Sequence, residues 1–555
     1  MVLHRLLRLA IHFVGVVTVY GDYLDPTTVV GLEATFIPNM NICENRMTSN
    51  YFRENIIFLS SLGRYNTERR PIVRQYFDWL LRSGELNQEE IRIEDVRNFG
   101  SQKRPILEEG NPEFDEIFQE ILLTLPEDIN PQDFQGYLLF RYTHLEDPLE
   151  EVGQFTLHDL LSLEALLRDT ILEDTSEMLS DQHRFESTEE YAEFSSVYEP
   201  SDQFRQEWNE RITLDVRDVL KEFVEGTLPD DPTFDPNLHE ERINTGQEIL
   251  EFLSYSGDRG ARMDFLSNPL FQLDGNRSEI VVPFPEVLLT TSQYRIEEYI
   301  SHFKDVQNVE NHRKGDIVEE LAQGLLRQIP SRNFVKNFQY VHDPHPGEAD
   351  SILFFDSSYW TVEVKSHPIF RKIPRQIELV KDRYTDKVVQ AIDQTRRAND
   401  YLDSIDNKFG LIYNLTGHKD PGSLISGGII ILDGFIPTLF SGNERADREM
   451  GMEQIHQYLT EDDRVVVITL YDLYQLIQEE GIEDFDEFLL WRTGYNGNIP
   501  VWGYSEREYW AFYFDNYRGN KEFQEGVETA AEKDIITVYI SARFNDKSHL
   551  QNLVD

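Results

Sequence analysis

Three charged residues stand at the ends of two neighbouring apolar runs in the middle of the chain. Asp350 begins the first run, Glu363 and Lys365 end the second, and an Asp-Ser-Ser turn separates the runs. This pattern predicts a β-hairpin that brings the three side chains together. Because side chains alternate along a strand, Glu363 and Lys365 project from one face, and Glu348 projects beside Asp350 in the same way.

Carboxylates crowded in this way need a cation to offset their charge. Oxygen ligands alone suit Mg²⁺ or Mn²⁺. A lysine beside such a metal can orient or deprotonate a water molecule, and metal and lysine together can stabilise charge at a phosphorus centre. The residues therefore favour a metal-dependent hydrolytic site. A Glu-x-Lys by itself is more commonly a solvated pair on a strand, so the neighbouring elements carry weight.

One helix is expected before the hairpin and one after it. Apolar residues at helical spacing predict the first just after Gly315, with Glu319 at the edge of its buried face. An alternating strand over residues 334–341 follows. The second helix is expected over 384–403. Its apolar stripe leaves Gln390, Gln394 and Arg397 on another face, where they could hold water or a phosphate, although exposed helix faces often have this composition.

This order of elements resembles the PD-(D/E)xK phosphodiesterase superfamily, which has the restriction-endonuclease-like fold with an αβββαβ core. The resemblance covers roughly residues 265–435 and departs from the motif at its proline, because Ala349 precedes Asp350. It implies that Lys365 acts on the attacking water and that Gln394 orients a reacting group. The metal ligands it implies are the carboxylates of Asp350 and Glu363 and the carbonyl of Val364, with Glu319 near that metal or on a second one and Glu348 beside them.

The resemblance implies an α/β fold, with a restriction-endonuclease-like core and a mixed sheet, preceded by a mainly α-helical N-terminal region. We expect segments 1–264, 265–470 and 471–555, the last a helical and aromatic-rich extension packed on the core. Residues 428–433 fit the next core strand, and 464–470 extend the sheet. The implied activity is Mg²⁺- or Mn²⁺-dependent hydrolysis of nucleic-acid phosphodiesters, with DNA preferred to RNA and endonuclease to exonuclease. The rivals are an inactive nuclease-fold binding or scaffold protein, and an unrelated structure.

Charge limits where a nucleic acid could bind. The net charge is −49, with 14 lysines against 38 arginines, a composition typical of proteins that work in concentrated salt. An acidic protein of a non-halophilic organism is the alternative. Residues 301–400 hold 15 acidic and 15 basic residues, so the other 455 residues carry all of the net charge. A polyanion could approach this window, although chance and structural ion pairs can also account for its balance.

The ends of the chain suggest little chemistry. Residues 1–20 resemble a signal peptide but lack a small-residue cleavage site, so we expect a buried strand or helix. A single cysteine, Cys43, fits a reducing cytoplasm, and no segment has the length of a membrane span. His342 and His345 are expected as turn residues. The aromatic segment 502–517 could stack on bases, but packing against the sheet edge is the expected role.

The region before the nuclease-like core is expected to be helical and to recruit any protein partner. Apolar spacing predicts helices over 157–172, 212–224 and 241–255, with Thr156 as an N-cap, and earlier ones over 52–62, 72–82 and 114–125. Residues 269–285 predict two extended pieces around a turn, followed by a helix over 287–303.

Overall fold

The computed structural model describes the chain from residue 131 onward, with gaps. The described ranges are 131–180, 202–227, 236–255, 268–272, 278–342, 345–366, 377–404, 408–418, 421–433, 440, 447, 452–460, 462–479, 481–494, 501–503, 505–521, 524 and 538–540. The chain divides into two compact units. The first contains Met1–Gln102 and Gln154–Arg295, and the second contains Lys103–Gly153 and Ile296–Asp555.

The first unit packs helices against one long central helix, α9. Helices α11, α12, α13 and α14 all contact α9, and a small sheet has the strand order β1-β4-β3-β2. The expected N-cap of α9 is confirmed, because Thr156 Oγ1 accepts the Asp159 amide and Asp159 Oδ2 accepts the Thr156 amide. The bounds are α9 Leu157–Ser180, α11 Asp202–Ile212, β1 Thr213–Asp215, α12 Val216–Thr227, α13 Pro236–Leu253, β2 Ser254–Tyr255, β3 Leu270–Gln272, β4 Glu279–Val281 and α14 Pro285–Thr290.

Two predicted helices of this region are interrupted. The helix expected from residue 212 begins only at Val216, because Thr213–Asp215 pairs as strand β1 with β4. The helix expected over 287–303 is two helices, α14 and α15 (Ser292–Ser301), separated at Thr291. The two extended pieces are confirmed as the antiparallel pair β3 and β4. Pairing of β1 with β4 decided the first of these interruptions, which helical periodicity alone does not reveal.

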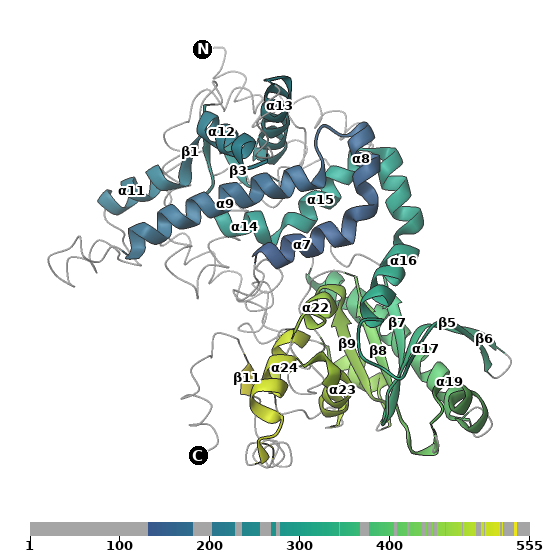
Figure 1. Ribbon diagram of the computed structural model, residues 1–555. Helices are drawn as coiled ribbons and strands as arrows, with labels where there is room; N and C mark the ends of the chain where they lie inside the picture. The colour runs from purple at the N-terminus through teal and green to yellow at the C-terminus, as the bar shows by residue number, and fades with distance from the viewer. Residues whose placement is uncertain are drawn as a thin grey trace, which may run out of the picture. The chain divides into compact units, whose positions relative to one another are not determined.

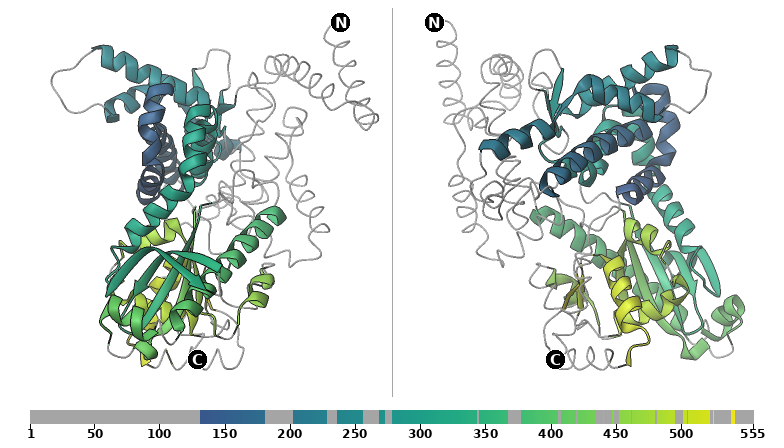
Figure 2. Two further views of the ribbon diagram at one scale, coloured as in Figure 1. Left: turned by 90° about the vertical axis from the view of Figure 1, so that its right-hand side faces the viewer. Right: turned by 60° about the vertical axis from the view of Figure 1, so that its left-hand side comes forward.

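The second unit is built on a mixed five-stranded sheet with the order β5-β6-β7-β8-β9 (Figure 1). Strands β5, β6 and β7 are antiparallel neighbours, whereas β7, β8 and β9 run parallel. Figure 2 shows the β5–β6 hairpin as a long twisted ribbon. The bounds are β5 Asn333–His342, β6 His345–Phe354, β7 Ser358–Lys365, β8 Ile425–Leu432 and β9 Val465–Thr469.

Helices cover both faces of this sheet. Helix α17 (Ile377–Asp403) contacts β5 to β8, and Asn399 of α17 accepts a hydrogen bond from Thr361 of β7. On the opposite face, the indole of Trp360 donates to Asp486 of α23 (Phe485–Thr493). Helices α16 (Lys304–Leu326) and α22 (Leu470–Leu476) contact one another, and α22 packs beside β9. The sheet is therefore a layer between helices.

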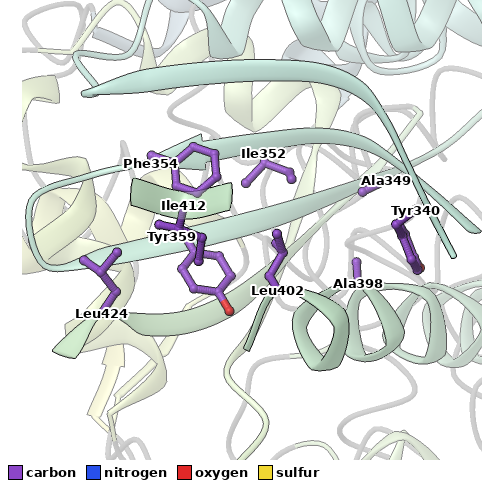
Figure 3. Packing of buried hydrophobic residues seen from close by; sticks show 9 residues of the cluster. All are labelled: Tyr340, Ala349, Ile352, Phe354, Tyr359, Ala398, Leu402, Ile412 and Leu424. Carbon is purple, nitrogen blue, oxygen red and sulfur yellow. The ribbon is translucent and has the colours of Figure 1, made fainter. Parts of the chain in front are cut away.

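Packing on the two faces of the sheet explains two adjacent glycines in β8. Figure 3 shows Ile352 and Phe354 of the sheet with Leu402 of α17 in one buried cluster. A Cβ atom on Gly427 would lie 2.2 Å from Cζ3 of Trp360, and one on Gly428 would lie 2.9 Å from Thr395 Oγ1. Only glycine leaves room at these positions for the ring on one face and the helix on the other.

Several element boundaries differ from those predicted. Helix α16 begins at Lys304 and passes through Gly315, and β6 begins at His345, inside the expected loop. His342 and His345 pair at the ends of β5 and β6, while their side chains lie outside the described part of the structure. The aromatic segment packs mainly on a helix, because Trp510 of α24 (Glu506–Phe512) contacts Phe488 of α23.

The compact units do not follow the three consecutive segments expected from the sequence. Among the described residues, 131–153 belong with the sheet, 268–272 and 278–295 belong to the first unit, and those after 470 share the unit of the sheet. Residues 1–20, Cys43 and the three earliest predicted helices lie outside the described residues. Among the helices that the structure describes, none is both long and apolar enough to cross a membrane.

Two glycine substitutions should change stability in opposite directions. Gly427→Ala should lower the free energy of unfolding by about 1–3 kcal/mol, because the new methyl group meets the buried Trp360 ring. Gly324→Ala should raise it by about 0.5–1 kcal/mol, because Gly324 lies exposed within α16 with no atom near its Cβ position. Urea unfolding of both variants measures the difference. Equal stability of the two would contradict the packing described for β8.

Candidate active site

The strands β6 and β7 separate at the predicted site. Their antiparallel pairing ends at Ser351 and Val362, so Asp350 and Glu363 are the next residues along the two strands. There the side chain of Asp350 replaces the strand as hydrogen-bond acceptor, because its Oδ2 accepts the backbone amide of Val364 at 2.6 Å. The carboxylate that the sequence predicted beside Glu363 is thus held against β7.

Glu363, Lys365 and Gln394 form one hydrogen-bonded group. Lys365 Nζ donates to Glu363 Oε2 at 3.0 Å and to Gln394 Oε1 at 2.5 Å. Glu363 and Lys365 share the face on which Thr361 bonds α17, as strand alternation predicted. The Glu363 side chain is 2% exposed, whereas the Lys365 side chain is 14% exposed, so the lysine lies nearer to solvent.

Glu319 joins the site through a residue that sequence reasoning missed. Nε2 of Gln323, one turn later on α16, lies 2.8 Å from Glu319 Oε1, 2.9 Å from the carbonyl of Asp350 and 2.7 Å from Asn337 Oδ1. Asn337 has φ = 50°, a left-handed conformation that asparagine tolerates. The i,i+4 spacing of Glu319 and Gln323 was a usable signal. The backbone conformation of Asn337 was not visible in the sequence.

The acidic side chains raise one another's pKa values. Burial, followed by the charges of Asp350 and Glu348, raises the pKa of Glu319 to about 7. Burial and the charge of Asp350 raise the pKa of Glu363 to about 7, although Lys365 opposes the shift. Burial also raises the pKa of Asp350, against the lowering effect of the Val364 amide and Lys365. Glu348 itself is exposed. A nearby cation would relieve this repulsion.

The donor atoms fit a cation only in part. Within the described residues, no three His, Cys, Asp or Glu side chains are grouped closely enough to hold a metal ion. However, Glu363 Oε1 is buried without a hydrogen-bond partner, and a buried carboxylate oxygen needs a donor or a cation. Hard oxygen donors on Asp350, Glu363 and Glu319 suit Mg²⁺ or Mn²⁺. The roles of Glu348 and the Val364 carbonyl as ligands stay predictions.

A buried ion cluster lies directly behind the site. The backbone amide of Asp433, just after β8, donates to the carbonyl of Lys365 at 3.0 Å. The carboxylate of Asp433 accepts two hydrogen bonds from Arg141 of α7 (Pro131–Tyr142), at 2.8 and 3.0 Å. Lys314 Nζ of α16 lies 3.2 Å from Asp433, and Glu310 accepts from both Arg141 and His144. Sequence reasoning missed this cluster, because Arg141 and Asp433 are far apart in the chain.

Comparisons with known proteins add no relative. No family model, no curated protein and no solved structure matches the chain. The site therefore has to be interpreted from its own geometry.

Removing the charge of Asp433 should destabilise the second unit strongly. Asp433→Asn leaves the buried Arg141 and Lys314 with only one of their two shared carboxylates, Glu310, and the loss should be about 3–5 kcal/mol in the free energy of unfolding. The matched control is Asp356→Asn, which breaks the exposed pair with Arg332 and should cost less than about 1 kcal/mol. Denaturant unfolding of the two variants, side by side, tests this. Similar losses would contradict a buried cluster.

The stability due to Asp433 should also depend on pH. Burial alone would raise its pKa, but Arg141 and Lys314 outweigh burial and lower the pKa from 3.8 to about 2. A lowered pKa stabilises the folded state above the unfolded value, and this contribution is lost as the pH falls through the folded value. The difference in unfolding free energy between wild type and Asp433→Asn should therefore shrink by roughly 2 kcal/mol between pH 5 and pH 2. A difference independent of pH would contradict it.

Proposed function

We propose that the protein is a metal-dependent nuclease that hydrolyses nucleic-acid phosphodiester bonds. The observation that carries the proposal is the contact of Lys365 Nζ with both Glu363 and Gln394, beside Asp350 at the point where β6 and β7 separate. A lysine in contact with a buried carboxylate and an amide, at the carboxyl end of a strand, suits the handling of a water molecule.

The arrangement of elements supports the same proposal. The order α16, β5, β6, β7, α17, β8 is the αβββαβ order that the resemblance to PD-(D/E)xK nucleases implies. Each predicted site residue falls on the element expected for it, with Glu319 on the first helix and Gln394 on the second. The buried, unpartnered Glu363 Oε1 supports a cation as part of the working site.

The side chains have distinct proposed roles. Asp350, Glu363 and Glu319 would hold Mg²⁺ or Mn²⁺, which when bound stabilises negative charge on phosphate oxygens and lowers the pKa of water. Lys365 Nζ would orient the attacking water and receive or return its proton. Gln394 fixes Lys365 through its Oε1 atom, and its amide nitrogen can donate to a phosphate oxygen. DNA is proposed ahead of RNA, and internal ahead of terminal cleavage, on the resemblance alone.

Cleavage should depend on Lys365 and Asp350. Lys365→Ala removes the group that contacts the water, and Asp350→Ala removes a proposed metal ligand, so each should lower the rate of cleavage at least about 100-fold. The assay follows labelled single- and double-stranded DNA and RNA with Mg²⁺ or Mn²⁺, in high KCl because of the acidic composition. Asp356→Asn, in the exposed turn after β6, is the control and should cleave like the wild type.

Metal binding separates the enzyme from an inert relative of the same fold. Calorimetric titration with Mn²⁺ should show binding by the wild type and clearly weaker binding by Glu363→Gln, which keeps the size of the side chain but removes its charge. Cleavage of no DNA or RNA form by the wild type would refute the proposed activity. Failure to bind metal as well would leave the binding or scaffold protein as the better explanation.

A further inference from the structure

One flank of α17 carries cations and amides without a carboxylate among them. Their spacing of three and four residues places them on one line, next to the buried stripe of the same helix. Three of the residues are exposed and two are half-buried. In order along the helix the members of this basic line are Arg383, Lys387, Gln390, Gln394 and Arg397.

The basic line passes the candidate active site. Gln394 accepts the hydrogen bond of Lys365, and the charge of Arg397, one turn later, acts on both Glu363 and Tyr340. Lys387 lies two turns before Gln394, about 10 Å along the helix axis. A chain of phosphates lying along this flank would therefore have a cation on each side of the proposed reacting position.

The cations of this line form no direct ion pair with a carboxylate among the described residues, although the charge of Arg397 acts on the buried Glu363. No ion pair within that part of the chain involves Arg383, Lys387 or Arg397. Arg396, on the other flank, shows the contrast, because it binds Asp463 at 2.7 Å and Asp393 at 3.2 Å. In a protein with 101 acidic and 52 basic residues, a row of cations that form no direct ion pair within the described ranges indicates an anionic ligand.

An acidic line limits the width of that ligand. The acidic line consists of Asp386, Asp393 and Asp400, which are all exposed. Each comes one residue before Lys387, Gln394 or Tyr401, which places it further round the helix from the buried stripe. A single strand can keep its phosphates on the basic line. A duplex carries a second backbone that would approach Asp386 and Asp400, which repel it, whereas Asp393 is already paired with Arg396.

Aromatic rings continue the basic line beyond Arg397. Tyr401 follows four residues later, with its ring centroid 5.3 Å from that of Tyr340 and 6.1 Å from that of Phe338. Tyr401 and Phe338 are half-buried residues that pack against the core cluster containing Tyr340, and part of each residue stays exposed. Unpaired bases stack on such rings, whereas bases within a duplex are not available to them.

We infer that this flank of α17 binds one strand of nucleic acid. Arg383, Lys387 and Arg397 contact its phosphates, and a base stacks at Tyr401. The inference rests on the proposed function, because it assigns the substrate of that site as single-stranded. DNA and RNA share the phosphate and base chemistry on which the inference rests, so the experiment tests a strand of each.

The experiment measures binding without cleavage. Fluorescence anisotropy of a labelled single strand, made once as DNA and once as RNA, is recorded in EDTA over a range of KCl concentrations. Each phosphate contact contributes about −0.7 to the slope of log affinity against log salt, so three contacts give about −2. Replacing Arg383, Lys387 or Arg397 with Gln should each make the slope shallower by about 0.7. Between 1 M and 0.1 M KCl, the affinity of each variant should therefore rise about fivefold less than that of the wild type.

Matched controls separate these contacts from general charge effects. Arg332→Gln makes the same change in charge just before β5, at the opposite end of the sheet from Lys365, and should leave the slope unchanged. Tyr401→Leu should weaken binding roughly tenfold with little change in slope, and Tyr401→Phe should restore it, because the ring supplies the stacking.

The inference fails if the three substitutions leave the slope as it was, or if a duplex of the same sequence binds as tightly as the single strand. Both results are independent of cleavage, since EDTA removes the metal. Salt-dependent binding without any cleavage in Mg²⁺ or Mn²⁺ would refute the proposed activity alone. Tight binding of the single strand, as DNA or as RNA, supports the inference. Comparison of the two affinities shows whether the site prefers deoxyribose or ribose.

Discussion

The hydrogen bond from the Val364 amide to Asp350 organises the centre of the second unit. Regular pairing of β6 with β7 ends at Ser351 and Val362, and the Asp350 carboxylate takes the place of the missing strand acceptor for Val364. A half-buried backbone amide that has lost its strand partner needs another acceptor, so Asp350 is held beside β7. This brings its charge beside Glu363, and the remaining features of the site follow from that proximity.

The crowding has an electrostatic cost that the surrounding structure meets in two ways. Lys365 and Arg397 place positive charge near Glu363, and Gln323 places an amide near Glu319 and the carbonyl of Asp350. Neither neutralises the cluster, because the pKa values of Glu319 and Glu363 still rise to about 7. Retained repulsion of this kind is common at functional sites and uncommon in a purely structural sheet edge.

Behind the site the balance is the reverse. Asp433 is buried among Arg141 and Lys314, and its pKa falls to about 2. This cluster holds Asp433 just after β8, and the backbone amide of Asp433 donates to the carbonyl of Lys365, so a charge-balanced cluster supports the strand that carries the repelling carboxylates. Because the charge-balanced Asp433 cluster stabilises the fold separately from the candidate site, the fold tolerates the repulsion among the carboxylates of that site.

The sequence by itself determined the local elements and the identity of the acidic cluster. Strand alternation placed Glu363 and Lys365 on one face, and helical spacing placed Glu319 and Gln394 on the helices to either side, because these patterns depend only on backbone geometry. Tertiary structure alone decided the break after Thr213–Asp215, the left-handed Asn337, the contact of Gln323, and the pairing of Arg141 with Asp433. Each depends on residues distant in the chain or on a local conformation that packing selects, and no spacing rule reports either.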